Sequence, residues 1–353
     1  MDKTEVKWSI LPIKKYPDHA ARWDALVCAR PGTPFLESIF LKPLLNVFGS
    51  GDECLCLLED GGHLHAAAIM QRDGKAGWQT FQPSQLPLGA WITDGRVDLT
   101  SASRSLLREL PGLNLVLGVS QIDPSLQIRP DDNALLRTQD YIATAWVDID
   151  SSFEAYWDAR GKNLKQNTRK QRNKLQGESI EPRIECITSP ELVADAIADY
   201  GKLESAGWKG ADGTAVALEN AQGRFYRTML ENFSAKGRAR IYRYWFDEKV
   251  VAMDLCIHDD TVLVILKTAY DESYKSVSPS TLMRQDQFQH LFTEKKFQRI
   301  EFFGKVMEWH TRWASQSRTI YHATAYRWAW LKALHARRAA VQAVHASIAP
   351  AES

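Results

Sequence analysis

The sequence lacks the cysteine pattern of a disulfide framework, and it lacks any segment that would cross a membrane. Its cysteines are odd in number, contain no C-x-x-C pair and are scattered along the chain, namely Cys28, Cys54, Cys56, Cys186 and Cys256. Such a set is typical of reduced thiols in a cytosolic protein. No stretch reaches the roughly 18 consecutive apolar residues of a membrane span, and MDKTEVKWSILPIKKY lacks the apolar core of a signal peptide. We therefore expect a cytoplasmic protein without a transmembrane segment.

An excess of charge of either sign is also absent. Lys and Arg together number 44 against 43 for Asp and Glu, which gives a formal net charge of +1. This balance excludes a general affinity of the whole chain for nucleic acid, and the 44% of hydrophobic residues exclude global disorder. The length of 353 residues predicts about two domains, since a domain usually has about 100–200 residues.

The stretch ECLCLLEDGGHLHAAA raises the question of a metal site. A hairpin that turns at Asp60 and Gly61 would place Cys54, Cys56, His63 and His65 on one face. However, ligands two residues apart on a strand diverge as the sheet twists, and four ligands from one hairpin rarely converge on a tetrahedral ion. We therefore predict a half-buried strand pair here and no bound metal.

The first half of the chain alternates helix-like and strand-like segments, which predicts a mixed α and β structure. In SSFEAYW, Ser151 and Glu154 form a capping box that is expected to open one long helix running to about Leu175. This helix is predicted to separate the two halves of the chain.

The second half predicts a sheet with an antiparallel start and a parallel end. Strands at 238–246, 250–258 and 261–270 are separated only by short turns, which indicates an antiparallel meander. A helix that begins near Thr281 leads from the third strand to RIEFFG, so these two strands should be parallel neighbours. A short helix EWHTRW, a strand TIYHATAYR and a basic helix from about Trp328 are predicted to follow.

The start of the helix near Thr281 has the chemistry of an anion site. Ser278 is suited to the N-cap and a proline follows it, so the amides of Ser280, Thr281 and Leu282 should point outward at the positive end of the helix. Such an end binds phosphate, and Lys275 would add a positive charge. An ordinary helix start explains the same residues and stays open as an alternative.

Several segments in a fixed order resemble a known family. The series ESAGWKGADGTA, KTAYDESYKSVSPS, IEFFG and EWHTRWAS…TIYHATAYR is similar in order and spacing to the CelD-like acetyltransferases, a FemAB-related family with two GNAT-like halves. That family typically carries W-K-G-x-x-G-T-A, then K-T-A-Y-D-E-x-Y followed by S-P-G, then a strand ending in D-F-G, then W-K-x-x-W. The similarity covers most of residues 150–327, with a looser echo in the first half.

The resemblance implies a mixed α/β fold of tandem GNAT-like type. Its expected parts are a degenerate N-terminal half at 1–150 with a structural or acceptor role, a connecting basic helix at 151–180, an acyltransferase half at 181–327, and a helix and tail at 328–353. Three positions depart from the family pattern. Ser280 replaces a glycine and narrows the space for a pyrophosphate, Glu301 replaces an aspartate, and His310 replaces a lysine.

The resemblance also implies acetyl-CoA or another acyl-CoA as co-substrate, and no metal. In GNAT proteins the strands that flank the phosphate loop splay apart, pantetheine lies in the gap, and loop amides take the pyrophosphate. Carried over to this chain, the cofactor-binding cradle spans 274–282, with Tyr274, Lys275, Ser278, Ser280, Thr281 and Leu282 as its contacts.

Acyl transfer to an amine needs a base for the ammonium proton, a donor to the oxyanion and an acid for the leaving thiolate. Glu204 and Glu301 are the candidate bases, Lys209 and Lys267 the candidate binders of an anionic substrate or the oxyanion, and Tyr270 the candidate acid.

Further residues are expected near the acceptor. Trp208, Trp309 and His310 are candidate substrate-binding residues in the family-like segments. Asp254, within the apolar strand VVAMDLCIH, is either a buried functional carboxylate or a solvent-facing residue.

A basic run within the connecting helix includes Lys165 and Arg169, which fall on one helical stripe. We interpret it as a solvated face or a funnel that draws an anionic substrate toward the cleft between the halves, with Lys165 and Arg169 as substrate-binding residues. A nucleic-acid face is less consistent with the near-neutral chain and the lack of interleaved aromatics. A tRNA contact stays open because FemAB-type relatives use aminoacyl-tRNA.

These observations predict an acyl-CoA-dependent N-acyltransferase that acts on an amino group of a sugar, nucleotide sugar or polysaccharide precursor, as the family's association with cellulose and exopolysaccharide implies. Two alternatives remain, an aminoacyl-tRNA-dependent transferase of peptidoglycan type and a catalytically silent GNAT-like binding module. The acceptor, the acyl length and the oligomeric state are not predicted.

Overall fold

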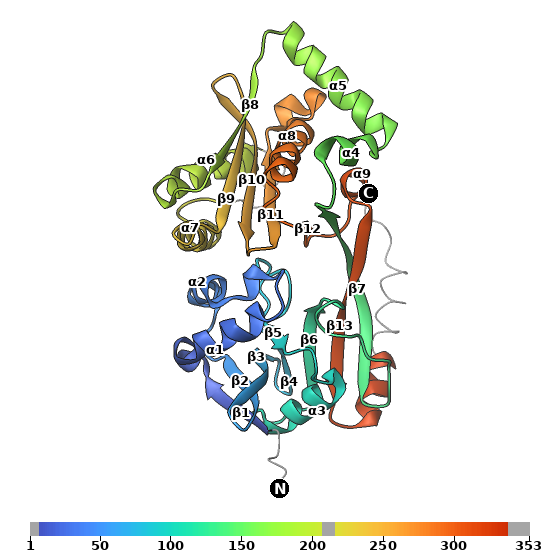
Figure 1. The fold of residues 1–353 in the computed structure, drawn as a ribbon. Helices are drawn as coiled ribbons and strands as arrows, with labels where there is room; N and C mark the ends of the chain where they lie inside the picture. Colours follow the sequence, from blue (N-terminus) through green and yellow to red (C-terminus); the bar gives the residue numbers. More distant parts are fainter. Residues whose placement is uncertain (1–6, 207–215, 338–353) are drawn as a thin grey trace, which may run out of the picture. The chain divides into compact units, whose positions relative to one another are not determined.

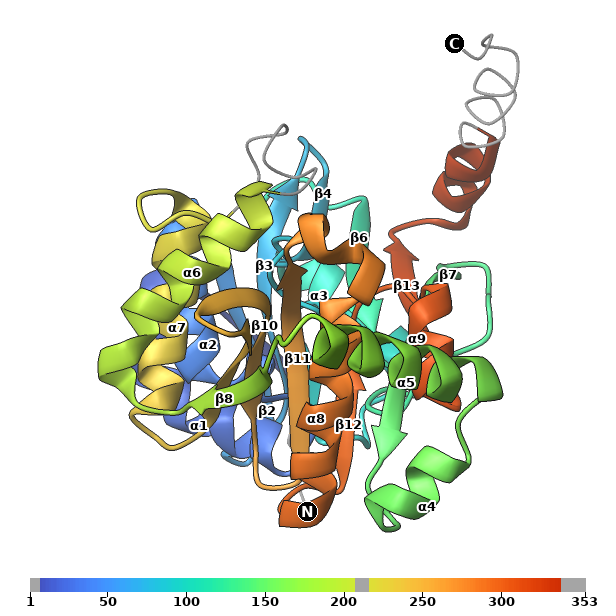
Figure 2. The same cartoon turned by 90° about the horizontal axis from the view of Figure 1, so that it is seen from above.

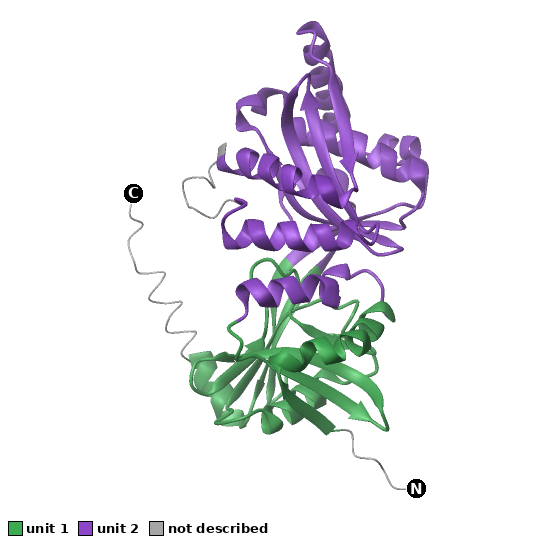
Figure 3. Ribbon diagram, turned by 90° about the vertical axis from the view of Figure 1, so that its left-hand side faces the viewer, with its two compact units in different colours: residues 1–29, 50–142, 319–353 green, residues 30–49, 143–318 purple. Residues whose placement is uncertain are grey.

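The computed structural model describes residues 7–206 and 216–337, and the chain divides into two compact units (Figure 1 and Figure 3). Unit 1 comprises residues 1–29, 50–142 and 319–353, and unit 2 comprises residues 30–49 and 143–318. The candidate residues Trp208 and Lys209 lie outside the described residues.

The two units divide the chain differently from the four consecutive segments that the sequence suggested. Residues 30–49 leave the first half and join unit 2, because the ring of Phe40 packs against that of Phe225, with centroids 5.2 Å apart. Residues from 319 onward join unit 1, because Ala323 pairs with Val119 in its sheet. The basic helix expected as a connector belongs wholly to unit 2.

Unit 1 is a mixed sheet with helices packed on it (Figure 1). Its strands follow the order β1-β2-β3-β4-β6-β13, and β5 pairs with β3. The β4–β6 pair is parallel, whereas the β1–β2, β2–β3, β3–β4, β3–β5 and β6–β13 pairs are antiparallel. The bounds are β1 (Lys7–Pro12), α1 (Tyr16–Cys28), β2 (Cys54–Asp60), β3 (His63–Asp73), β4 (Gly77–Thr80), β5 (Trp91–Thr93), α3 (Leu99–Glu109), β6 (Val116–Ile122) and β13 (Gln316–Tyr326).

The strands of unit 2 follow the order β7-β12-β11-β10-β9-β8. The meander β9-β10-β11 is antiparallel and β11 is parallel to β12, as predicted. The strand β7 (Leu136–Asp148) contributes its residues 143–148 to this unit. The other bounds are α2 (Ser38–Phe48), α4 (Phe153–Asp158), α5 (Lys162–Gly177), β8 (Pro182–Ile187), α6 (Val193–Ala206), α7 (Ala221–Ser234), β9 (Ala239–Phe246), β10 (Lys249–His258), β11 (Val262–Tyr270), α8 (Pro279–Glu294), β12 (Arg299–Phe302) and α9 (Glu308–Trp313).

Helices cover both faces of the sheet of unit 2. Figure 2 shows α6 and α7 on one face and α8 with α5 on the other. On the α8 face, Phe288 and Leu291 of the helix join Leu263 of β11 and Ile300 of β12 in one buried cluster. Apolar side chains that alternate along the strands therefore fix α8 over the β11–β12 pair.

The prediction of one long helix opened by Ser151 is wrong in two respects. Ser152 is the N-cap, and its hydroxyl accepts a hydrogen bond from the amide of Ala155 at 3.2 Å. The helix ends at Asp158, and a second helix starts at Lys162, because Gly161 takes a non-helical backbone with ψ of 140°. The chain therefore turns between α4 and α5.

The hairpin of β2 and β3 also corrects a prediction. Cys54 and Cys56 pair with Met70 and Ala68, so the thiols share a face with even-numbered residues of β3. A register shift between Leu58 and Glu59, which the sequence does not reveal, lies between these pairs and the pair of Asp60 with His63. The cysteines therefore have partners farther along β3 than the two histidines.

Two glycines of unit 2 allow the chain at 216–218 to cross closely over α6 and α7. A Cβ on Gly201 would lie 2.5 Å from the carbonyl oxygen of Val216, and one on Gly223 would lie 1.8 Å from that of Ala217. Both obstacles are backbone atoms, which cannot rotate away. These glycines therefore allow the segment at 216–218 to lie against the backbone of α6 and α7.

We expect Gly223→Ala to lower the free energy of unfolding by about 3 kcal/mol, because the added methyl overlaps the carbonyl of Ala217. Urea denaturation followed by circular dichroism measures the change. The matched control is Gly177→Ala at the end of α5, where nothing lies within 4 Å; it should be neutral or stabilising by up to about 1 kcal/mol. Equal stability of the two variants would contradict the close crossing.

Candidate active site

The parallel pairing between β11 and β12 is short. It joins Val262 to Arg299, Leu263 to Ile300 and Val264 to Glu301, and no further pair is formed between these strands. β11 continues to Tyr270, whereas β12 ends at Phe302. The last part of β11 therefore leaves an opening toward the segment that follows β12, as predicted for splayed strands.

The turn that enters α8 lies at this opening. Ser278 is the N-cap, as predicted, but it has a left-handed backbone with φ of +44°, and its hydroxyl caps no amide of the helix. Its carbonyl accepts hydrogen bonds from the amides of Thr281 at 2.9 Å and Leu282 at 3.3 Å. Of the predicted amide donors, only Ser280 is left without an acceptor among the described residues. The prediction of three outward amides is therefore corrected to one.

A cavity of about 390 Å³ lies between the end of β11, the start of α8, and α9. Three of the predicted cofactor contacts on the α8 turn, together with Lys275, line it. So does Tyr270, the candidate acid, which is half-buried. The tryptophans of α9 form an apolar side. The lining residues are Thr268, Tyr270, Lys275, Ser278, Ser280, Thr281, Arg284, Trp309 and Trp313.

A buried ion pair supports the wall of this cavity. Arg284 Nη1 lies 2.5 Å from Asp254 Oδ2, and the Arg284 side chain is 2% exposed while that of Asp254 is 0% exposed. The hydroxyl of Thr268 donates to Asp254 Oδ1 at 2.5 Å and accepts from Arg284 at 3.1 Å. Of the two alternatives for Asp254, the structure therefore has the buried one. Its charge is compensated, as a buried carboxylate requires.

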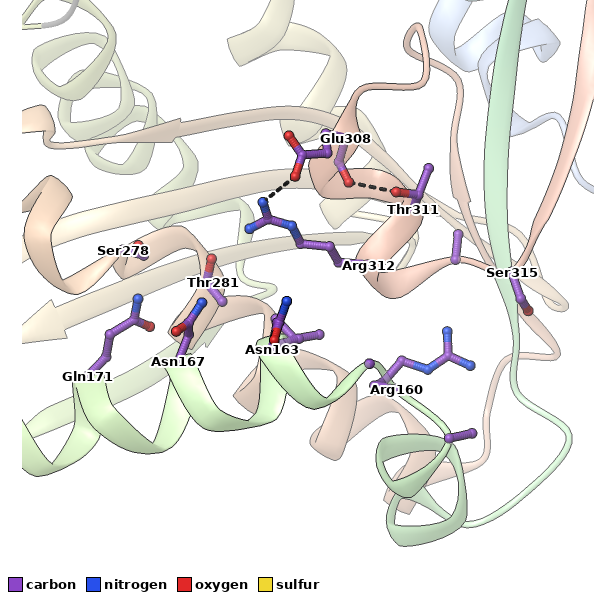
Figure 4. A pocket seen from close by; sticks show the side chains of 14 residues that line it. Arg160, Asn163, Asn167, Gln171, Ser278, Thr281, Glu308, Thr311, Arg312 and Ser315 are labelled. Atoms are coloured by element: carbon purple, nitrogen blue, oxygen red, sulfur yellow. Dashed lines mark hydrogen bonds and ion pairs between the residues drawn. The ribbon is translucent and has the colours of Figure 1, made fainter.

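A second, more polar cavity of about 810 Å³ adjoins the first, and the two share Ser278 and Thr281. Figure 4 shows Asn163, Asn167 and Gln171 pointing from α5 toward it. Their spacing of four residues places them on one face of the helix. The Oε1 atom of Gln171 is buried and has no hydrogen-bond partner among the described residues, so it offers an acceptor to a ligand.

The sequence analysis missed this row of amides. Between Lys162 and Lys174 the basic residues dominate the sequence, yet none of the basic side chains of α5 lines either cavity. Lys165 instead lies over the end of α4, where its ammonium donates to the carbonyl of Asp158 at 2.9 Å. Arg169 is exposed. The period of four in Asn163, Asn167 and Gln171 was the available signal.

The two candidate bases are both buried and both paired. Glu204 Oε1 lies 3.0 Å from Lys267 Nζ, and its Oε2 accepts from the amide of Val216 at 2.7 Å. Glu301 accepts two hydrogen bonds from Arg318, at 3.1 and 3.0 Å. The structure thus brings Glu204 and Lys267 together, as a lysine–carboxylate pair, and places Glu301 apart from them with an arginine.

The Glu204–Lys267 pair lies on the opposite side of β11 from the cavity. Residues alternate along a strand, so Lys267 points to the α6 face while Thr268 and Tyr270 point to the α8 face. The Lys267 ammonium lies 5.3 Å from the centre of the Tyr226 ring and 5.8 Å from that of Tyr200. Aromatic rings stabilise a cation at such distances.

The remaining candidate residues take part in packing or helix capping. Tyr274 packs its ring on Phe246 with centroids 5.4 Å apart, and Leu282 is fully buried in the core. Trp309 is 39% exposed and stacks on His310 with centroids 3.5 Å apart. The Nδ1 atom of His310 accepts the amide of Met307 at 2.9 Å, so this histidine caps the start of α9.

Comparisons with known proteins concern mainly the second part of the chain. Residues 162–311 match the family described as the acetyltransferase (GNAT) domain, so this segment is similar to a GNAT-type domain. No curated protein matches the sequence. No helix in the described ranges is both long enough and apolar enough to cross a membrane.

Solved structures with low sequence identity share the fold. FemX is 8% identical with a TM-score of 0.55, over 90% of this chain and 98% of its own. The C-terminal domain of a putative lysylphosphatidylglycerol synthetase from Agrobacterium fabrum is 14% identical with a TM-score of 0.54, over 87% and 92%. A conserved protein of unknown function from Bacteroides thetaiotaomicron is 10% identical with a TM-score of 0.54, over 91% and 100%. The predicted mixed α/β fold is confirmed, and its second half is similar to the GNAT domain.

Burial, and secondarily the charge of Arg284, lowers the pKa of His310 from 6.5 to about 4. Between these values the unfolded chain binds a proton that the folded chain does not, so stability is complete above pH 6.5 and falls as the pH drops. His310→Asn removes this titration. We expect the free energy of unfolding of the wild type to fall by about 2 kcal/mol more than that of the variant between pH 7 and pH 5.

Urea denaturation at both pH values measures this difference. The same substitution at the exposed His290 of α8 is the control, and it should keep the pH dependence of the wild type. An unchanged pH dependence in His310→Asn would show that His310 does not stay neutral in the folded protein.

Proposed function

We propose that the protein is an acyl-CoA-dependent N-acyltransferase that acts on an amino group of a sugar, nucleotide sugar or polysaccharide precursor. The observation that carries the proposal is the end of the β11–β12 pairing at Val264 and Glu301, which opens a cavity at the start of α8. The pantetheine arm of an acyl-CoA would lie between the tryptophans of α9 and the end of β11.

The residues around the α8 turn suit the phosphates of an acyl-CoA. The amide of Ser280 and the positive end of a 16-residue helix attract an anion, and the exposed Lys275 adds a charge at the edge of the cavity. The buried acceptor of Gln171 and the amides of Asn163 and Asn167 would bind polar groups of a ligand in the adjoining cavity. When bound, an acyl-CoA supplies a thioester that an amine can attack.

The Glu204–Lys267 pair lies on the α6 side of β11, and we propose that it removes the proton of an acceptor ammonium that approaches the thioester from that side. A carboxylate paired with lysine can exchange a proton through its partner, whereas arginine stays protonated, so Glu301 with Arg318 is better suited to hold charge and structure. Tyr270 has a hydroxyl that can protonate a leaving thiolate. Acceptor contacts are proposed for Trp309 at the cavity edge.

Aminoacyl transfer from tRNA is the second candidate. The side chains of Arg169 and Lys170 are exposed on α5, and no ion pair within the described ranges neutralises them. Such groups bind a phosphate backbone with a steep dependence on salt. The fold shared with FemX leaves the acyl donor open, because low identity carries the fold alone.

We expect acetyl-CoA or a longer acyl-CoA to raise the melting temperature of the protein, because a ligand that binds only the folded state stabilises it. Lys275→Glu should weaken this binding by at least about tenfold, as measured by calorimetry, because it reverses a charge at the cavity. The control is Lys236→Glu, at an exposed position after α7, which should bind like the wild type. No stabilisation by any acyl-CoA, with salt-sensitive stabilisation by tRNA, would replace the proposal with the second candidate.

Tyr270→Phe should lower kcat by about 10²-fold or more while KM for acyl-CoA changes little, because the variant loses the acid but keeps the ring. Release of free CoA with a panel of amino sugars measures turnover. The control is Tyr141→Phe, at an exposed position of unit 1. Full turnover by Tyr270→Phe would place the acid elsewhere, and acyl-CoA binding without turnover in the wild type would indicate a silent binding module.

A further inference from the structure

A cluster of three metal-binding side chains lies in unit 1, which contains none of the residues of the cavities described above. The Nδ1 atom of His65 lies 3.0 Å from Asp94 Oδ2, and the Nε2 atom of His63 lies 3.8 Å from the same oxygen. The three ligand atoms all lie within 4.8 Å of one another. The two imidazole rings meet edge to face, with centroids 4.5 Å apart.

The sheet of unit 1 places these groups together. His63 and His65 are two residues apart on β3 and share a face. β5 pairs with β3 through Thr93 and Ala66, and the amide of Asp94 then donates to the carbonyl of His65 at 2.8 Å. Strand pairing therefore brings an aspartate that is distant in sequence beside the two histidines.

A neighbouring hydrogen bond orients the carboxylate of Asp94. Its Oδ1 accepts from the amide of Arg96 at 2.9 Å, which turns Oδ2 toward the imidazoles. Outer contacts of this kind fix the orientation of metal-binding groups. The side chain of Asp94 is only 13% exposed, while that of His63 is 64% exposed, so one side of the cluster is held and the other is open to solvent.

We propose that His63, His65 and Asp94 form a binding site for a divalent transition metal, of which Zn²⁺ is the best match. Zinc takes imidazole nitrogens and carboxylate oxygens at about 2.0–2.2 Å, which puts neighbouring ligand atoms roughly 3.3 Å apart. The present separations of 3.0 and 3.8 Å from Asp94 Oδ2 bracket that value. Three protein ligands leave a fourth position for water or another group.

The site differs from the Cys–His arrangement considered from the sequence. Cys54 and Cys56 pair with Met70 and Ala68, and neither thiol belongs to the cluster of His63, His65 and Asp94. The third ligand comes from the end of β5, and a bound ion would link β3 to the segment that leads into α3, whose N-cap is Asp98. A metal here would therefore stabilise unit 1.

The test is titration of the full-length, tag-free and chelator-treated protein with Zn²⁺ by calorimetry, with Co²⁺ absorption as a spectroscopic probe of tetrahedral ligation. We expect one ion per chain and a rise in melting temperature. His63→Ala and Asp94→Asn should each weaken zinc binding by at least about tenfold, and His63→Ala should fold normally because His63 is exposed. The exposed His290→Ala in unit 2 is the matched control and should bind like the wild type.

No saturable zinc binding at micromolar concentration would overturn the proposal, as would a stoichiometry of one ion that survives in both His63→Ala and Asp94→Asn. Either result would reduce the cluster to a hydrogen-bonded histidine–aspartate pair. Because the readouts are metal binding and melting temperature, the outcome is independent of acyl-CoA binding and turnover.

Discussion

The interrupted pairing of β11 with β12 is the constraint on which the arrangement of unit 2 depends. Three residue pairs hold the strands together up to Val264 and Glu301, and beyond them the backbone of β11 faces an opening. Unpaired backbone groups at a sheet edge usually invite another strand. Here the start of α8 and the short helix α9 line the opening instead. The unpaired end of β11 therefore forms one wall of a cavity.

The opening needs rigid surroundings to persist. The buried pair of Asp254 and Arg284 ties β10 to α8, and Thr268 of β11 joins it through its hydroxyl. Replacing such a pair with apolar groups can preserve stability, whereas removing one partner leaves a costly buried charge. The pair therefore makes the position of α8 specific, because another seating of the helix would separate the two charges. On the opposite face, Glu204 and Lys267 tie α6 to β11 in a similar way.

Local patterns predicted the elements of the sheet better than they predicted its details. The meander and the parallel β11–β12 pair were predicted correctly from short turns and from one helical crossover. Such connections allow only a few arrangements of the strands. The cross-strand partners in the hairpin of β2 and β3 could not be predicted, because a bulge between Leu58 and Glu59 shifts the register. The left-handed backbone of Ser278 was hidden as well, since serine at an N-cap normally has an extended backbone.

The parts of the candidate site that lie in one contiguous segment, as around Ser278, could be predicted from the sequence. The parts whose interacting residues come from distant elements could not. Arg284 looks like an ordinary residue of a helix until Asp254 is placed against it. The amides of α5 were obscured by the basic residues between them. The partnership of Glu301 with Arg318 likewise joins different strands, β12 and β13, and needs the tertiary structure.

The discontinuous composition of the two units has a consequence for the order of folding. Phe40 of α2 packs on Phe225 of α7, and β6 obtains its partner β13 from a much later part of the chain. During synthesis at the ribosome, the apolar face of α2 and one edge of β6 must wait in contact with solvent or with a chaperone until those partners emerge. Such long-range pairings also slow the search for the native topology. The nascent chain is therefore most exposed to aggregation before β13 is complete.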